Sequence, residues 1–274
     1  MIHKTIKLTA DGRVNMRTYI HDISTEGFQL TKRPAIIVLP GGAYAFLSDR
    51  EAEPVALTFL KEGFNTFVLN YSVGDYSKFP NPLDDVSKAI WEVRKNADEW
   101  GIDPNAIALM GFSAGAGISA MAATQWNTSG LAERLGIPVG GNKPNAAILG
   151  YGAASNLSIV DDPSVFKPDF LGKIAIDRTP QLEVVNYVGP HTPPLFIWHN
   201  RYDEYVPSIN PLLMAETMQK HNLPYELHLF QGGVHGMSVN NNLSDYKSTN
   251  NSRSKSVGMW VQLCTYWLYD QFGI

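Results

Sequence analysis

The sequence predicts an α/β protein whose central sheet is mostly parallel and is covered by helices on both faces. Short, continuously apolar runs such as Ala35-Ile36-Ile37-Val38-Leu39 are typical of strands that are buried on both sides. Segments with helical periodicity alternate with these runs, as parallel strands with crossover helices require. A chain of 274 residues, 44% of them hydrophobic, can form one domain with a large core. We therefore expect a single domain over residues 1–274.

The ends of several elements carry recognisable signals. Pro40-Gly41-Gly42 ends the first strand, and Gly63 ends the helix after it. Asn81 is the expected N-cap of the next helix, with Pro82 in its first turn, and Asp103-Pro104-Asn105 is an expected turn. The expected strands are 35–39, 64–71, 107–110, 146–149, 195–199 and 225–230, and the expected helices are 52–60, 82–97, 114–126, 208–221 and a C-terminal helix through 257–268.

Two later regions need separate interpretations. Residues 152–194 contain six prolines and no long periodic pattern, so they predict an irregular, cap-like excursion over the edge or the active face of the sheet. The C-terminal helix has an apolar stripe that includes Cys264, which predicts a small core residue rather than a reactive thiol.

Composition excludes several classes of partner. Lys and Arg number 22 against 26 Asp and Glu, for a net charge of −4, so no basic surface is available for nucleic acid. The single cysteine excludes an intramolecular disulfide and a cysteine-built metal site, as a reducing compartment permits. Met1 to Ala10 has no apolar run, and no later stretch has membrane-spanning length. We expect a soluble cytoplasmic protein that binds neither nucleic acid nor membrane.

The segment Gly111-Phe112-Ser113-Ala114-Gly115 matches G-x-S-x-G between an expected strand and an expected helix. A sharp turn of this kind leaves no room for bulky neighbours and raises the serine above the sheet. The helix N-terminus beneath it favours a developing oxyanion. Ser113 is therefore the candidate nucleophile.

A serine hydroxyl needs an imidazole to take its proton and a carboxylate to orient that imidazole. Asp203 and His235 each follow an expected strand, and Ser113, Asp203, His235 is the chain order that this chemistry has in such folds. Glu204 is a rival for the acid. The other histidines are expected to be structural or on the surface: His3, His21, His191, His199, His221 and His228.

Four segments together resemble the α/β-hydrolase superfamily: Pro40 to Tyr44, Gly111 to Gly115, Thr192 to Pro207, and Gly233 to Gly236. Within it, they look most like esterases similar to hormone-sensitive lipase and like acetyl-xylan and carbohydrate acetyl esterases. The resemblance implies that Ser113 is the nucleophile, Asp203 the acid and His235 the base. It also implies that the oxyanion hole is formed by the N–H groups of Gly42, Ala43 and Ala114.

The oxyanion segment departs from that family pattern. Pro40 and Ala43 stand where the family often has a histidine and a third glycine. Ala43 still has an N–H group, so the oxyanion hole can survive. The missing histidine leaves open what steadies the loop.

These features predict a serine carboxylesterase that forms an acyl-enzyme and requires no metal or organic cofactor. The expected partner is a small-molecule ester with a short acyl group, acetyl above all, on a carbohydrate or another small alcohol. Residues near the expected strand ends form the candidate substrate pocket: Tyr44, Tyr151, Trp198 and Met237.

Three alternatives stay open. The same triad chemistry would serve a peptidase, and some hydrolase-fold proteins only bind ligands. Gly115 to Ala120 also fits the dinucleotide fingerprint G-x-G-x-x-G/A of an oxidoreductase. Its first glycine lies beyond the turn, however, and the next expected strand begins only near Ala146. The sequence also leaves a homo-oligomer open.

Overall fold

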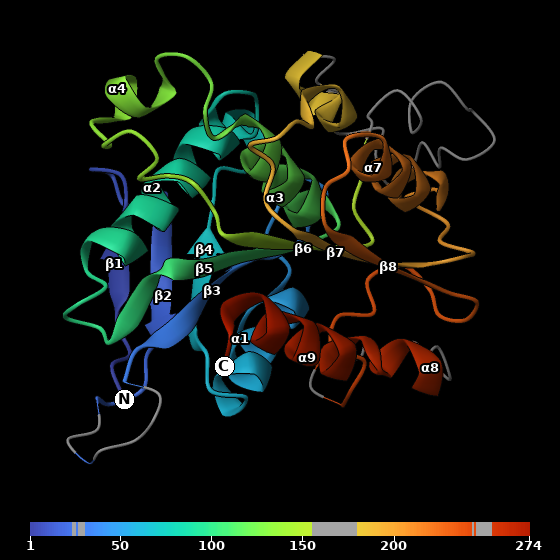
Figure 1. Cartoon of the computed structure of the whole chain (residues 1–274), viewed down its shortest axis with the longest axis horizontal. Coiled ribbons are helices and arrows are strands. Elements are labelled where there is room, and N and C mark those ends of the chain that lie inside the picture. The colour runs from blue at the N-terminus through green and yellow to red at the C-terminus, as the bar shows by residue number, and fades with distance from the viewer. Residues whose placement is uncertain (24–25, 27–30, 155–179, 243, 245–253) are drawn as a thin grey trace.

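The computed structural model describes residues 1–23, 26, 31–154, 180–242, 244 and 254–274. An eight-stranded sheet lies between two layers of helices (Figure 1). The strand order is β1-β2-β4-β3-β5-β6-β7-β8; β1 and β2 are antiparallel to their neighbours, and all pairs from β4 to β8 are parallel. The predicted fold class is therefore confirmed. The strands are β1 Thr5–Lys7, β2 Asn15–Tyr19, β3 Arg33–Leu39, β4 Asn65–Asn70, β5 Ile102–Phe112, β6 Ala146–Gly150, β7 Leu195–Asn200 and β8 Tyr225–Phe230.

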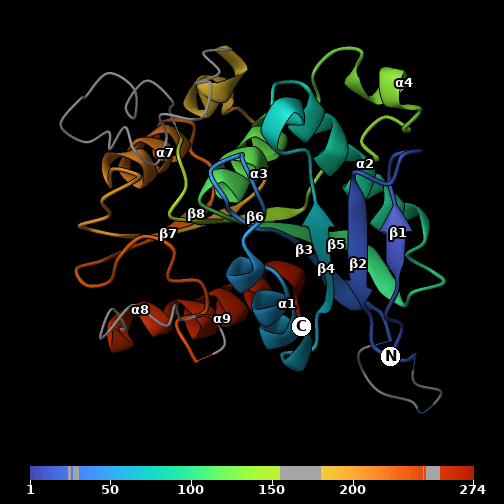
Figure 2. The ribbon, with the colours of Figure 1, turned by 180° about the vertical axis from the view of Figure 1, so that it is seen from behind.

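The helices divide between the two faces of the sheet. On one face lie α1 Glu53–Lys61, α8 Lys255–Gly258 and α9 Trp260–Phe272 (Figures 1 and 2). On the other lie α2 Asn81–Lys95, α3 Ala114–Gln125 and α7 Ile209–Lys220, with the short α4 Leu131–Leu135 beside α2. Successive residues of a strand point to opposite faces, so Ile37 joins one core cluster while Ile36 and Val38 join the other.

The structure confirms one local expectation, corrects another and adds two strands. Residues 103–105 fall within the bounds of β5, but its register with β3 passes from Arg33–Ile102 to Ala35–Ile107, and the Asn105 N–H donates to Asp103 Oδ1 at 2.8 Å, as the expected turn requires. Asn81 is the first residue of α2 rather than its N-cap, and its side chain donates to the Tyr76 carbonyl at 3.1 Å. The edge strand β1 and its neighbour β2 were not expected from the sequence, although Met16 in β2 is fully buried.

The other expected elements agree with the structure to within a few residues. Cys264 lies in the core, as expected, and burial raises the pKa of its thiol well above the usual value. Of the expected excursion at 152–194, residues 155–179 lie outside the described part. The rest includes two short 3-10 turns, Pro180–Leu182 and Val184–Tyr187.

The parallel strands place their carboxyl ends along one edge of the sheet. In such sheets ligands bind at that edge. The loops after β3, β5, β7 and β8 carry the oxyanion segment, Ser113, Asp203 and His235, respectively. No helix within the described ranges is long and apolar enough to cross a membrane.

Candidate active site

Ser113 lies in a sharp turn between β5 and α3. Its backbone has φ 51° and ψ −119°, in a region that non-glycine residues rarely adopt. A Cβ atom on Gly111 would lie 2.2 Å from the Gly115 carbonyl oxygen, and one on Gly115 would lie 2.1 Å from the Leu39 carbonyl oxygen. Both positions therefore require glycine. The Ser113 N–H donates to the Gly150 carbonyl at 2.9 Å, which ties the turn to β6.

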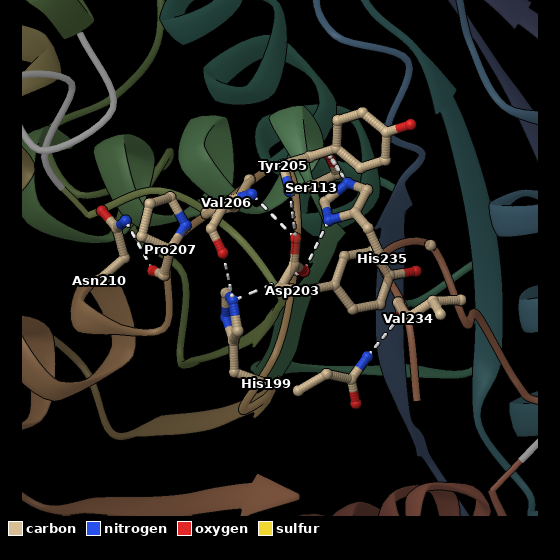
Figure 3. Close-up of polar contacts among 12 residues, drawn as sticks. Ser113, His199, Asp203, Tyr205, Val206, Pro207, Asn210, Val234 and His235 are labelled. Atoms are coloured by element: carbon tan, nitrogen blue, oxygen red, sulfur yellow. Dashed lines mark hydrogen bonds and ion pairs between the residues drawn. The ribbon is translucent and has the colours of Figure 1, made fainter. Parts of the chain in front are cut away.

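His235 lies between Ser113 and Asp203 (Figure 3). Ser113 Oγ is 2.8 Å from His235 Nε2, and His235 Nδ1 is 2.7 Å from Asp203 Oδ2. A carboxylate only accepts hydrogen bonds, so Nδ1–H donates to Asp203 and Nε2 is left to accept the serine proton. The structure thus brings together three side chains that are up to 122 residues apart in the sequence.

The carboxylate of Asp203 is buried and fully engaged. Oδ1 accepts the N–H groups of Tyr205 and Val206, each at 2.9 Å, while Oδ2 faces His235. Burial by itself would raise the pKa of Asp203, but the hydrogen bond and charge of His235, together with smaller contributions from His199 and Val206, outweigh burial and lower it. Asp203 is therefore ionised at neutral pH. The rival Glu204 is exposed.

The histidine loop is held from both sides. Asn200, at the end of β7, donates from Nδ2 to the Val234 carbonyl at 2.6 Å. Arg50 donates to the Gly236 carbonyl at 2.5 Å. The rings of Tyr151 and Tyr205 lie edge-on to the imidazole of His235, at centroid distances of 5.1 and 5.4 Å. These contacts leave the ring little freedom to turn.

The loop after β3 lies against the nucleophile. A Cβ atom on Gly41 would be 2.9 Å from Ser113 Cβ, and one on Gly42 would be 2.0 Å from the Phe46 carbonyl oxygen. Gly42 has φ 134° and Ala43 has φ 53°. Within the described residues, the N–H groups of Gly42 and Ala43 donate to no protein acceptor, and Ala114 begins α3. The three predicted oxyanion donors thus lie on the two segments that flank Ser113.

Three of the four predicted pocket residues are corrected by the structure. Tyr151 and Trp198 are 0% exposed and Met237 is 4% exposed, all in the core cluster under α9. Trp198 stacks on Trp260 with a centroid distance of 4.7 Å. Large aromatic groups at strand ends gain more by core burial than by facing solvent. Tyr44 alone is partly exposed, and a Cβ atom on Gly117 would lie 2.9 Å from its hydroxyl oxygen.

Two residues near this site, His199 and Glu51, were not predicted to take part in it. His199 Nε2 donates to the Val206 carbonyl at 2.9 Å and lies 3.6 Å from Asp203 Oδ2, so it supports the acid loop from below. Glu51 is 3% exposed and accepts the Gly41 N–H at 2.8 Å. An acid just before a helix normally indicates a favourable charge at the helix N-terminus, so the sequence pattern around Glu51 does not predict burial. No group of metal-binding side chains occurs in the part of the chain described.

A parallel sheet with a sharp strand-to-helix turn at a serine, and with His and Asp on later strand ends, defines an α/β hydrolase. The sequence pattern of the BD-FAE family matches residues 22–218. The chain therefore belongs to this α/β-hydrolase family, and the resemblance of its motifs to that superfamily is confirmed.

Individual relatives agree with this assignment. The endo-1,4-beta-xylanase B of Butyrivibrio fibrisolvens is 30% identical over 241 residues, covering 83% of this chain and 35% of that protein. The acetylxylan esterase of Xylanibacter ruminicola is 30% identical over 244 residues, covering 85% of this chain and 45% of that protein. The chain thus spans less than half the length of these two relatives. The crystal structure of MGS-M1, an alpha/beta hydrolase enzyme from a Medee basin deep-sea metagenome library, has a TM-score of 0.78 and 33% identity, covering 100% of this chain and 99% of that one.

Proposed function

We propose that this chain is a serine carboxylesterase that hydrolyses short-chain esters, acetyl esters above all, of carbohydrates or other small alcohols. The observation that carries the proposal is the hydrogen-bonded series Ser113–His235–Asp203, with links of 2.8 and 2.7 Å. The name of the acetylxylan esterase among the relatives supports the choice of acyl group and alcohol.

The mechanism follows from the roles of these groups. His235 Nε2 takes the proton of Ser113 as Oγ attacks the ester carbonyl, and the N–H groups of Gly42, Ala43 and Ala114 stabilise the oxyanion. His235 then gives the proton to the departing alcohol, which leaves an acyl-enzyme on Ser113. Water attacks this ester, again with His235 as base, and releases the carboxylic acid. Asp203 holds the Nδ1–H tautomer throughout.

The proposal extends to partners and location. The partner is a small-molecule ester, since the net charge of −4 offers no attraction for nucleic acid. The single, buried cysteine is compatible with a reducing compartment, so we place the protein in the cytoplasm. The reaction requires no metal or organic cofactor, because proton transfer and charge stabilisation are both supplied by the protein.

Esterase activity is tested by steady-state hydrolysis of p-nitrophenyl acetate by the purified protein and its Ser113→Ala variant. The variant should lose several orders of magnitude in kcat, on the order of 10⁵ to 10⁶, and should no longer react with a fluorophosphonate. Ser129→Ala, at an exposed serine, is the matched control and should retain both properties. Equal turnover by Ser113→Ala and the parent would refute the assignment.

Acyl preference is tested with p-nitrophenyl esters from acetate to octanoate. We expect kcat/KM to be greatest for acetate and to fall with acyl length. A maximum at octanoate would contradict a short-chain esterase. Release of acetate from acetylated xylo-oligosaccharides, compared with release from acetylated small alcohols, would then show which kind of alcohol the enzyme prefers.

A further inference from the structure

A buried carboxylate lies behind the loop that carries the oxyanion donors. Glu51 ends the 3-10 turn Asp49–Glu51 and is 3% exposed. Its Oε2 accepts the N–H of Gly41 at 2.8 Å, and its Oε1 accepts the hydroxyl of Tyr151 at 2.7 Å. Both carboxylate oxygens are therefore used, and neither hydrogen bond involves one of the reacting groups.

The peptide unit between Pro40 and Gly41 is held at both of its polar ends. The Tyr71 hydroxyl, after β4, donates to the Pro40 carbonyl at 2.5 Å, while the N–H of the same unit donates to Glu51. Tyr71 is 2% exposed. A peptide unit is planar, so fixing its C=O and its N–H fixes the orientation of the whole unit. The backbone of Gly42 and Ala43 continues from that orientation.

The same carboxylate is connected to the histidine loop. The hydroxyl oxygen of Tyr151 accepts the N–H of Ser238 at 3.0 Å while its proton is donated to Glu51. Ser238 follows His235 by three residues and is itself anchored, since its carbonyl accepts the indole N–H of Trp260 at 2.8 Å. Burial, with the nearby Glu51 carboxylate, raises the pKa of Tyr151 well above its usual value. Tyr151 therefore stays neutral and keeps the proton that it donates.

The connected segments all contain unfavourable backbone conformations. Ala43 has φ 53°, Tyr44 φ 61°, Tyr151 φ 39° and Ser238 φ 51°. Non-glycine residues with such angles are strained and persist only where surrounding contacts hold them. The hydrogen bonds of Glu51 join the segments that contain Ala43 and Tyr151. Without them, the loop is free to relax toward a more favourable conformation.

We propose that Glu51 is a positioning residue that fixes the oxyanion N–H groups of Gly42 and Ala43 relative to Ser113 and, through Tyr151, relative to the loop of His235. Tyr71 holds the opposite end of the Pro40–Gly41 peptide unit. Pro40 stands where the family often has a histidine. The Glu51 carboxylate, which lies behind the loop, can stabilise it in place of that histidine. The inference rests on the proposed esterase function.

The effect of such a residue should be specific to the transition state. The oxyanion exists only after attack, so misplaced N–H groups weaken transition-state stabilisation more than substrate binding. Glu51→Ala should lower kcat for p-nitrophenyl acetate by about 10²- to 10³-fold, the size of losing one oxyanion donor, with little change in KM. Binding of a trifluoromethyl ketone, which forms a tetrahedral adduct, should weaken in parallel with kcat/KM.

Conservative variants distinguish positioning from general structural damage. Glu51→Gln keeps an oxygen for the Gly41 N–H and should recover a large part of the activity that Glu51→Ala loses. Tyr151→Phe and Tyr71→Phe each remove one hydroxyl and keep the ring, and each should lower kcat less than Glu51→Ala. The matched control is Glu53→Gln, two residues along the chain on the surface of α1, which should match the parent.

All rates are expressed per site titrated to completion with a fluorophosphonate, so that unfolded protein is not counted. The proposal is overturned if kcat per titrated site is unchanged in Glu51→Ala, or if KM and kcat are altered equally and Glu51→Gln gives no recovery. If Glu51→Ala does not fold, Tyr151→Phe and Tyr71→Phe decide, and parental kcat in both overturns it. An inactive parent enzyme, or an active Ser113→Ala variant, would instead refute the esterase function itself.

Discussion

The two sides of the active site are held in different ways. On the nucleophile side, residues 111–117, backbone segments pack so closely that Cβ atoms on Gly111 and Gly115 would approach carbonyl oxygens to 2.2 and 2.1 Å. On the acid–base side, residues 199–210 and 230–240, polar side chains and N–H groups hold the loops, as Asn200 holds the Val234 carbonyl at 2.6 Å. Close packing fails when volume is added, whereas hydrogen bonds fail when a charge or a donor changes.

Of the changes that compare these two sides, a charge change on the acid–base side is expected to have the largest effect. Asp203→Asn offers an amide donor near Nδ1 and favours the wrong tautomer of His235, so kcat should fall by about 10⁴-fold. Measured kcat for p-nitrophenyl acetate and the melting temperature give the two readouts. The neighbouring exposed acid provides the control, because Glu204→Gln should keep the parental kcat. If Glu204→Gln were the inactive variant, the acid would have been assigned to the wrong residue.

On the nucleophile side, added volume should damage the fold. Gly115→Ala places a Cβ atom 2.1 Å from the Leu39 carbonyl oxygen, a backbone clash that should cost about 3 kcal/mol or more of unfolding free energy in urea titrations. Gly117→Ala is the matched control in the same helix. Its Cβ atom would meet only the end of the Tyr44 side chain within 3 Å, and alanine favours helix by about 1 kcal/mol. Equal destabilisation of both variants would contradict steric control by this turn.

Lowering the pH is expected to have a smaller effect, a loss of stability that arises at His199 on the acid–base side. Burial lowers the pKa of His199, although Asp203 and the Val206 carbonyl act in the opposite direction. As the pH falls below about 6.5, His199 therefore takes up a proton in the unfolded chain at a higher pH than in the folded protein. The free energy of unfolding decreases as a result. This loss amounts to at most about 1.4 kcal/mol per pH unit for one group.

The pH effect is measured by urea unfolding from neutral pH to about pH 5.5. His199→Gln should be less stable than the parent at neutral pH but should show a shallower decline. The exposed His221 gives the control His221→Gln, which should follow the parent. An equally steep decline in His199→Gln would show that other groups cause the acid sensitivity.

Local patterns predicted most of the parallel part of the sheet, which comprises six of its eight strands. Continuous apolar runs and helical stripes are determined by burial, which acts on each segment separately. The edge strand β1 and its neighbour β2 lack such runs, since β1 is mostly exposed and β2 alternates. The turn expected at 103–105 interrupts the pairing of β5 with β3 between Ile102 and Ile107, because the Asp103 carboxylate accepts the Asn105 N–H locally.

The candidate catalytic side chains could be identified from sequence for a physical reason. Ser113 sits in a motif whose glycines are required by local backbone geometry, and Asp203 and His235 directly follow buried strands whose carboxyl ends meet. The roles of the buried side chains behind them, Tyr151 and Glu51, could not be identified from the sequence. Tyr151 was expected in the pocket but is 0% exposed, and Glu51 was not singled out although both of its oxygens are engaged.

The class of fold and the side chains that meet at the strand ends can therefore be predicted from the sequence, because both depend on short-range patterns of burial and backbone geometry. How those side chains and the oxyanion loop are held depends on the tertiary structure. The partners of Glu51 lie 10 and 100 residues away along the chain. A hydrogen bond between such distant residues depends on how the sheet brings its strand ends together, and no local pattern records it.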